Sequence, residues 1–182
     1  MNPTEVRDYW FQRDRKDWFE KNPAFDEEIR SRFLPLFKRG LQDQLQTWRQ
    51  TPAACLALVI LLDQFPRNMF RGSAKAFAAD PQARAAARVI LDNRWDKAMT
   101  PDERMFAYLP LEHSESLADQ ERCLALMQEI SVFPETADLP KWAEAHLVII
   151  QRFGRFPHRN AALGRASTPE ELEFLKQPGS SF

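Results

Sequence analysis

Apolar side chains recur along the chain at the three- and four-residue spacing of amphipathic helices. In one clear segment, Ile29, Phe33, Leu36 and Phe37 fall on a single helical face. No segment alternates apolar and polar residues between hairpin turns, so the pattern gives no sign of a strand. It predicts an all-α fold, with roughly eight to ten helices joined by connections of the usual short length.

Threonine followed by proline marks three predicted helix starts, at Thr51, Thr100 and Thr168. The threonine side chain caps the helix, and proline takes the first position, where its missing N–H costs nothing. Glu103 and Glu171 lie three residues after two of these threonines and complete a capping-box pattern. Further starts are predicted at Asp26, Asp80, Pro110 and Pro140.

The predicted helices differ in how deeply they are buried. Residues 52–65 are apolar nearly all round, which is typical of a central helix, whereas residues 81–94 mix alanines with arginines and predict an outer helix packed by one face. In the helix that starts at Asp26, Gly40 is a natural C-terminal stop. Pro35 predicts a kink or a break in the same helix.

Length and composition predict one domain over residues 1–182, because 182 residues with 44% hydrophobic side chains are enough for one full core. The net charge of -1 disfavours nucleic acid and acidic membranes as partners. The N-terminal 15 residues are too charged for a signal peptide, and the longest apolar run, 53–62, is about half a membrane span. We expect a cytoplasmic protein whose Cys55 and Cys123 are reduced thiols in the core.

Two short segments concentrate hydrogen-bond donors. One lies between His146 and Pro169, where no Asp or Glu occurs, and the other covers residues 64–72. Their donors are Arg67, Asn68, Arg71, Arg152, Arg155, Arg159, Asn160 and Arg165. Planar guanidinium groups are suited to binding carboxylates or phosphates.

Polar side chains also interrupt the apolar faces of several predicted helices. Asp63 continues the face of Leu56 and Ile60 in the central helix, and Arg67 would follow it if the helix lasted that far. The segment after Pro110 places His113, Leu117, Gln120, Leu124 and Met127 on one stripe, with Glu112, Glu115 and Asp119 beside it. In the next helix Trp142, His146, Ile149 and Phe153 share a face.

Buried polar groups need partners, because an unpaired one costs roughly 1–3 kcal/mol. The first interpretation is that these groups pair with one another and form an internal network that binds nothing. The second is a pocket in which some arginines hold a small anionic ligand and His113 or His158 donates or accepts a proton. The residues that would form it are Asp63, Arg67, Asn68, Arg71, Glu112, Glu115, His146, Arg152, Arg155, Arg159 and Asn160. Whether such a site is catalytic stays open.

Other chemistries fit the sequence less well. A metal site at Glu112, Glu115 and the histidines lacks the Glu-x-x-His repeat of helical bundles, and the arginines would repel a cation. Ser114 points away from its histidine neighbour on a helix, and the cysteines lack basic neighbours. No phosphate loop or dinucleotide motif is present, so we predict no cofactor.

Four long segments resemble the signature blocks of the DUF924 family: LLDQFPRNMFRG at 61–72, AFAAD at 76–80, MFAYLPLEHSESLADQ at 105–120 and RFGRFPHRNAALGRASTPEELEFL at 152–175. The resemblance implies a bacterial protein with a tetratricopeptide-like array of antiparallel helix pairs, and it implies no activity. That fold raises an alternative function, a groove for a peptide or partner protein, with arginines clamping a carboxylate terminus.

Overall fold

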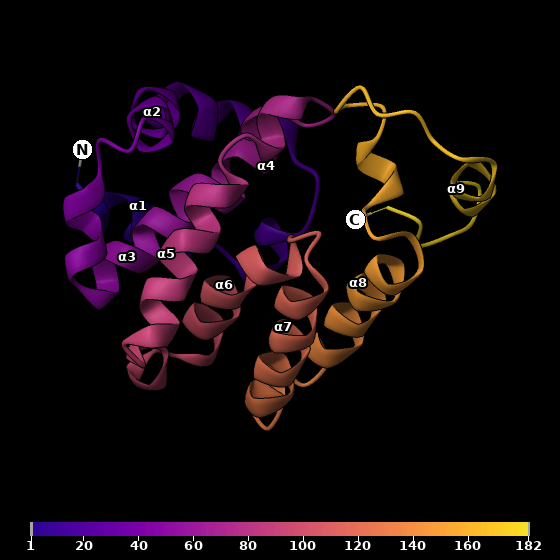
Figure 1. Ribbon diagram of the computed structural model, residues 1–182. Coiled ribbons are helices and arrows are strands. Elements are labelled where there is room, and N and C mark those ends of the chain that lie inside the picture. Colours follow the sequence, from indigo (N-terminus) through magenta and orange to yellow (C-terminus); the bar gives the residue numbers. More distant parts are fainter. Residues whose placement is uncertain (1, 182) are drawn as a thin grey trace.

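The computed structural model describes residues 2–181, and its regular elements there are all helices (Figure 1). The predicted all-α fold is thus confirmed. Short 3-10 turns join several of the α-helices. The α-helices are α1 (Pro3–Phe11), α2 (Pro23–Leu41), α3 (Pro52–Val59), α4 (Phe65–Met69), α5 (Asp80–Asp92), α6 (Pro101–Glu112), α7 (Leu117–Ile130), α8 (Leu139–Phe153) and α9 (Pro169–Phe174).

Two of the predicted threonine caps are confirmed in full. Thr100 and Thr168 each accept the backbone N–H three residues on, and the glutamate at that position binds back. Thr51 stands before α3 but makes no capping bond through its side chain. The predicted cap at Asp26 is wrong, because Asn22 caps α2 and Pro23 takes its first position, which leaves Asp26 inside the first turn.

Prolines interrupt these helices less than their missing N–H suggests. Pro35 lies inside α2, and Pro110 lies inside α6 rather than at the start of a new helix. Residues 103–112 of α6 are all buried, so side-chain packing offsets the lost backbone bond. Pro140 is the second residue of α8, as predicted.

Gly40 has a different role from the predicted helix stop, because α2 continues to Leu41. A Cβ atom added at Gly40 would lie 2.8 Å from Cδ2 of Leu62. Glycine lets α2 approach the central helix closely there, whereas a larger residue would have to displace the end of the Leu62 side chain.

The central helix is α3, whose residues from Cys55 to Val59 are buried, as the sequence predicts. It continues through a wider π-helical turn, Ile60–Gln64, into α4. The turn has a local cause: Pro66 cannot donate a backbone hydrogen bond, and the N–H of Phe65 bonds to the carbonyl of Ile60 five residues back. The π-turn and the first residues of α4 stay buried as far as Pro66, which places Asp63 inside the protein.

Helices α5, α6, α7 and α8 follow one another side by side, each packed against the next (Figure 1). After α8, Gly154 adopts the left-handed conformation that ends the helix, and the chain continues to α9. This C-terminal part has a small apolar cluster of its own, formed by Ile149, Ile150 and Phe156 with Phe153 and Phe174 beside them. Within residues 2–181, no helix is both long and apolar enough to cross a membrane.

Candidate functional site

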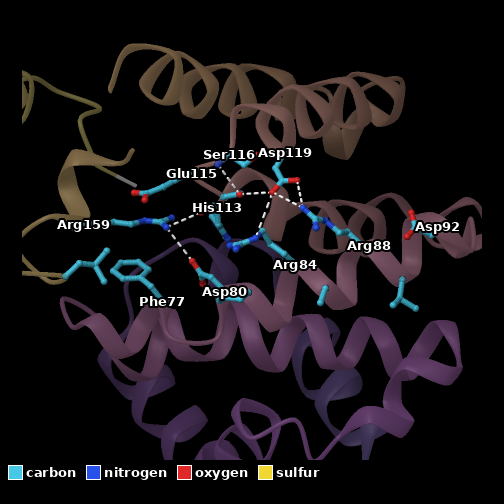
Figure 2. Close-up of a pocket in the computed structure, with 15 residues that line it drawn as sticks. Phe77, Asp80, Arg84, Arg88, Asp92, His113, Glu115, Ser116, Asp119 and Arg159 are labelled. Carbon is cyan, nitrogen blue, oxygen red and sulfur yellow. Dashed lines mark hydrogen bonds and ion pairs between the residues drawn. The ribbon is translucent and has the colours of Figure 1, made fainter. Parts of the chain in front are cut away.

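A cleft of about 820 Å³ opens between α5 and the segment 113–116 that joins α6 to α7. Figure 2 shows Arg159 at one end of it and Asp92 at the other. The residues of α5 that face the cleft recur at helical spacing. They are Pro81, Arg84, Ala85, Arg88, Val89 and Asp92. The cleft therefore follows the outer face of a single helix that is packed by its other face, as the sequence predicts for 81–94.

Asp63 lies under one end of this cleft and is fully buried. Its Oδ1 is 2.8 Å from Nδ1 of His113, and its Oδ2 accepts a 2.6 Å hydrogen bond from the Gln64 side chain. Arg67, one turn on, approaches Oδ1 to 3.3 Å. Burial opposes ionisation, but Arg67 and His113 outweigh it and lower the pKa of Asp63 below its usual range. Asp63 is therefore an ionised acceptor at neutral pH.

His113 ends α6 as its C-terminal cap, and its side chain lines the cleft. Because ionised Asp63 can only accept, Nδ1 of His113 carries the proton, and Nε2 keeps its lone pair. Burial and the nearby Arg67 lower the pKa of His113, despite the opposing effect of Asp63. Nε2 has no hydrogen-bond partner within the described residues. His113 is thus a neutral, oriented imidazole with one open nitrogen.

Arg159 reaches the cleft from the 3-10 turn Pro157–Arg159 and is only 6% exposed. Its Nη1 contacts Oδ2 of Asp80 at 3.4 Å and the backbone carbonyl of His113 at 3.0 Å. Nε is buried without a partner, and Nη2 makes no hydrogen bond to any residue in 2–181. Burial, together with the charge of Arg67, lowers the pKa of Arg159 to about 10. The group stays charged at neutral pH with one edge unused.

Two aromatic rings flank the Arg159 guanidinium. Its central carbon lies 4.6 Å from the ring centre of Phe77 and 4.5 Å from that of Phe156. These contacts are within the range of cation–π attraction and fix the position of the guanidinium. Asp80 completes the arrangement, because it also accepts two hydrogen bonds from Arg67, at 3.1 and 3.3 Å.

Glu112 and His146 form a second buried pair beside the first. His146 Nδ1 is 2.9 Å from the carbonyl of Trp142 and 3.6 Å from Oε1 of Glu112. Burial, with Asp63 nearby, raises the pKa of Glu112 to about 8, and burial lowers the pKa of His146 to about 3. Both groups are therefore uncharged at neutral pH.

The structure brings only part of the predicted set together. Asp63, Arg67, His113 and Arg159 meet around Asp80, with Glu112 and His146 next to them; we call these seven residues the central cluster. Glu115 lines the cleft but binds Arg165 at 2.7 Å, and His158 packs beside the Phe156 ring.

Other candidates lie in pairs of their own. Asn68 and Arg71 both bind Asp26 on α2, and Arg152 binds Glu170 at the surface. Arg155 and Asn160 both bind Glu171 on α9. None of these five lines the cleft. The donors of these five residues are therefore taken up by acids outside the cleft.

Two predicted helical stripes also need correction. His113 belongs to the end of α6, since α7 begins only at Leu117, and Leu117 itself is 44% exposed. Gln120 is inward as predicted, and its amide donates to the carbonyls of Glu112 and Ser114. In α8, His146 is inward but Trp142 is 50% exposed. The turn between α6 and α7 resets the register, so the first stripe cannot be extended across it.

Sequence reasoning missed several residues of the cleft. Asp80 looked like an ordinary acidic residue at a helix start, yet it links Arg67 to Arg159. Arg84 and Arg88 lie along α5 and approach Asp119 of α7 at 3.9 and 3.1 Å. The helical spacing of Asp80, Arg84 and Arg88 is visible in the sequence, but the partner that the two arginines face on α7 is not. Among residues 2–181, no three His, Cys, Asp or Glu side chains are grouped so that they could hold a metal ion.

Comparison with known proteins settles the family. The profile of a family described as "Bacterial protein of unknown function (DUF924)" matches residues 6–179. The chain belongs to the DUF924 family. A solved structure of a protein of unknown function from Agrobacterium tumefaciens, ATU0120, is 39% identical to this DUF924 chain, covers 96% of each chain and superposes with a TM-score of 0.88. Comparison with curated proteins gives no match.

Proposed function

We propose that the cleft of this DUF924 protein binds a small anionic ligand at Arg159 and that His113 exchanges a proton with that ligand. The observation that carries the proposal is the unused Nε–Nη2 edge of a buried guanidinium that lines the cleft. A buried donor without a partner costs roughly 1–3 kcal/mol. A ligand that accepts from this edge would recover that cost, which is a reason for an anion to bind here rather than at a satisfied arginine.

The position of His113 supports the second half of the proposal. The Arg159 Nη1 donates to the backbone carbonyl of His113, so the imidazole and the free guanidinium edge belong to one end of the cleft (Figure 2). A proton leaving an O–H or an acidic C–H of the ligand would go to Nε2 of His113. Ionised Asp63 at 2.8 Å would then stabilise the imidazolium that forms. This is the arrangement of an oriented general base.

A thermal-shift titration with sodium acetate and with inorganic phosphate tests the binding step. Wild-type protein should gain stability with anion concentration, by about 2.7 kcal/mol at a hundredfold excess over Kd. Arg159→Lys keeps a positive charge but loses the planar edge, so it should lose most of this gain. Arg152→Lys is the matched control, because Arg152 lies at the surface and outside the cleft. Equal gains in all three proteins would contradict the proposal.

The alternative is that the central cluster serves only as a structural network. It is favoured by Asp80, which is shared by two arginines, and by Asp63, which is bound by Arg67, Gln64 and His113. On this alternative no anion stabilises the protein, and Arg159→Lys changes stability without changing any anion response.

A further inference from the structure

We infer that the ligand of this cleft is a monocarboxylate with an apolar body, whose carboxylate lies in the plane of the Arg159 guanidinium. The inference rests on the proposed function and narrows it, because an anion site could equally serve phosphates. Three features carry it: the shape of the free edge, the charge balance around it and the apolar side chains beside it.

The free edge favours a planar anion. Nε–H and the nearer Nη2–H of a guanidinium point in parallel and match the two oxygens of a carboxylate. Phe77 and Phe156 flank the guanidinium at 4.6 and 4.5 Å from their ring centres, and Phe156 is fully buried. A ligand therefore approaches beside the guanidinium rather than over it. A carboxylate fits this approach, whereas a phosphate or phosphonate carries a further oxygen out of the plane.

The charge balance favours a single negative charge. Asp63 and Asp80 face Arg67 and Arg159, so these four charges cancel. Glu112, His113 and His146 are uncharged at neutral pH. A monoanion would leave the buried group with one net negative charge, and a dianion would leave it with two. Because uncompensated charge is costly away from water, the second negative charge of a phosphate ester is disfavoured.

The walls near Arg159 favour an apolar body. Phe77 and Leu163 line the same cleft as Arg159, and Leu163 lies one helical turn after it. Pro81 and Ala85 continue this lining along α5. Arg88 hydrogen-bonds to Asp119 at 3.1 Å and Arg84 approaches the same carboxylate at 3.9 Å, so Asp119 competes with any second anionic group for both arginines (Figure 2). An apolar group attached to the carboxylate would cover these side chains.

Benzoate and phenylphosphonate share a phenyl body and differ in the head group, so they form a matched pair for isothermal titration calorimetry. We expect benzoate to bind wild-type protein at least tenfold more tightly than phenylphosphonate at pH 7.5, where the phosphonate is mainly a dianion and Glu112 is mainly protonated. Acetate, which has the same head group and almost no body, should also bind at least tenfold more weakly than benzoate. Arg159→Lys should lower the affinity for benzoate at least tenfold, and Arg152→Lys should leave this affinity unchanged.

Each contrary result has a distinct meaning. Phenylphosphonate binding as tightly as benzoate, with both lost in Arg159→Lys, would overturn the carboxylate preference and leave the proposed anion site standing. Acetate binding as tightly as benzoate would overturn the inference that the ligand has an apolar body. Benzoate binding that survives Arg159→Lys would place the ligand elsewhere and overturn the inference. No binding by any of the three anions would overturn the proposed function as well.

Discussion

Two arginines of the same sequence segment, Arg155 and Arg159, look alike in the sequence and differ in how completely their hydrogen-bond donors are used in the structure. In the C-terminal knot, formed by Arg155, Asn160, Thr168 and Glu171, the single carboxylate of Glu171 accepts from both side chains and from the Thr168 backbone N–H. Arg155 binds it through Nε at 2.6 Å and Nη2 at 2.7 Å. In the central cluster, Arg159 hydrogen-bonds through Nη1 alone, and its Nε–Nη2 edge has no partner among residues 2–181.

The difference teaches that the number of arginines does not mark a binding site. Glu171 is only 2% exposed and makes a bidentate contact with the Arg155 guanidinium. It thus already occupies the place that a carboxylate ligand of Arg155 would take. The C-terminal knot therefore has a structural role, which is to hold α9 and the chain after α8. Arg159 is more deeply buried than Arg155, but no protein acceptor among residues 2–181 binds the Nε–Nη2 edge of its guanidinium.

The largest expected effect comes from Asp63→Ala in the central cluster. Removing this buried carboxylate leaves Arg67, His113 and Gln64 without their shared acceptor, so we expect a loss of about 3–5 kcal/mol in the free energy of unfolding. Urea denaturation measures it. A loss below about 1 kcal/mol would mean that the cluster is not the tightly coupled unit described above.

Glu112→Gln should change how stability depends on pH. The pKa of Glu112 is raised to about 8, from an ordinary value of 4.5. Between these values the folded state holds a proton that the unfolded state releases, so wild-type stability falls as pH rises through this window. Glutamine cannot ionise. The free energy of unfolding of the variant, relative to the wild type, should therefore rise by on the order of 2–4 kcal/mol between pH 5 and pH 9.

Urea denaturation of both proteins at several pH values gives this difference directly. Glu144→Gln, on the exposed side of α8, is the control and should show no such gain. Parallel pH profiles for Glu112→Gln and the wild type would show that Glu112 is already ionised in the folded protein at neutral pH.

Glu171→Ala should have a smaller and more local effect. Arg155, Asn160 and the backbone N–H of Thr168 would lose their acceptor, which predicts a loss of about 1.5–3 kcal/mol, the range for hydrogen bonds to charged groups. Hydrogen exchange should increase over residues 155–175 and stay unchanged in α3. Benzoate affinity that fell as much as in Arg159→Lys would show that the C-terminal knot and the cleft are not separate.

Arg152→Ala should have the smallest effect. Its partner Glu170 is 62% exposed at the side chain, and exposed ion pairs contribute about 0–1 kcal/mol. A thermal unfolding midpoint within about 1–2 °C of the wild type is expected for a chain of this size. A large drop would mean that the surface arginines of the C-terminal segment also belong to a cooperative network.

The helical fold and the burial of several polar side chains could be predicted, because both depend on the spacing of residues that are close in sequence. The apolar positions of α3 and the burial of Asp63 follow from one uninterrupted stripe. His113 was placed on the wrong helix because the turn at 113–116 resets the register. The pairings could not be predicted, since Arg155 and Arg159 are four residues apart in sequence and bind acids on α9 and α5, respectively.

The most direct test of the central claim is the ¹⁵N NMR signal of the Arg159 Nε–H, identified by its loss in Arg159→Lys and followed during a benzoate titration. If a carboxylate binds the open edge, this proton should move downfield and exchange more slowly with water as benzoate saturates, while the Arg155 Nε–H stays unchanged because Glu171 already binds it. A benzoate-saturated protein in which the Arg159 Nε–H signal does not move would contradict the account.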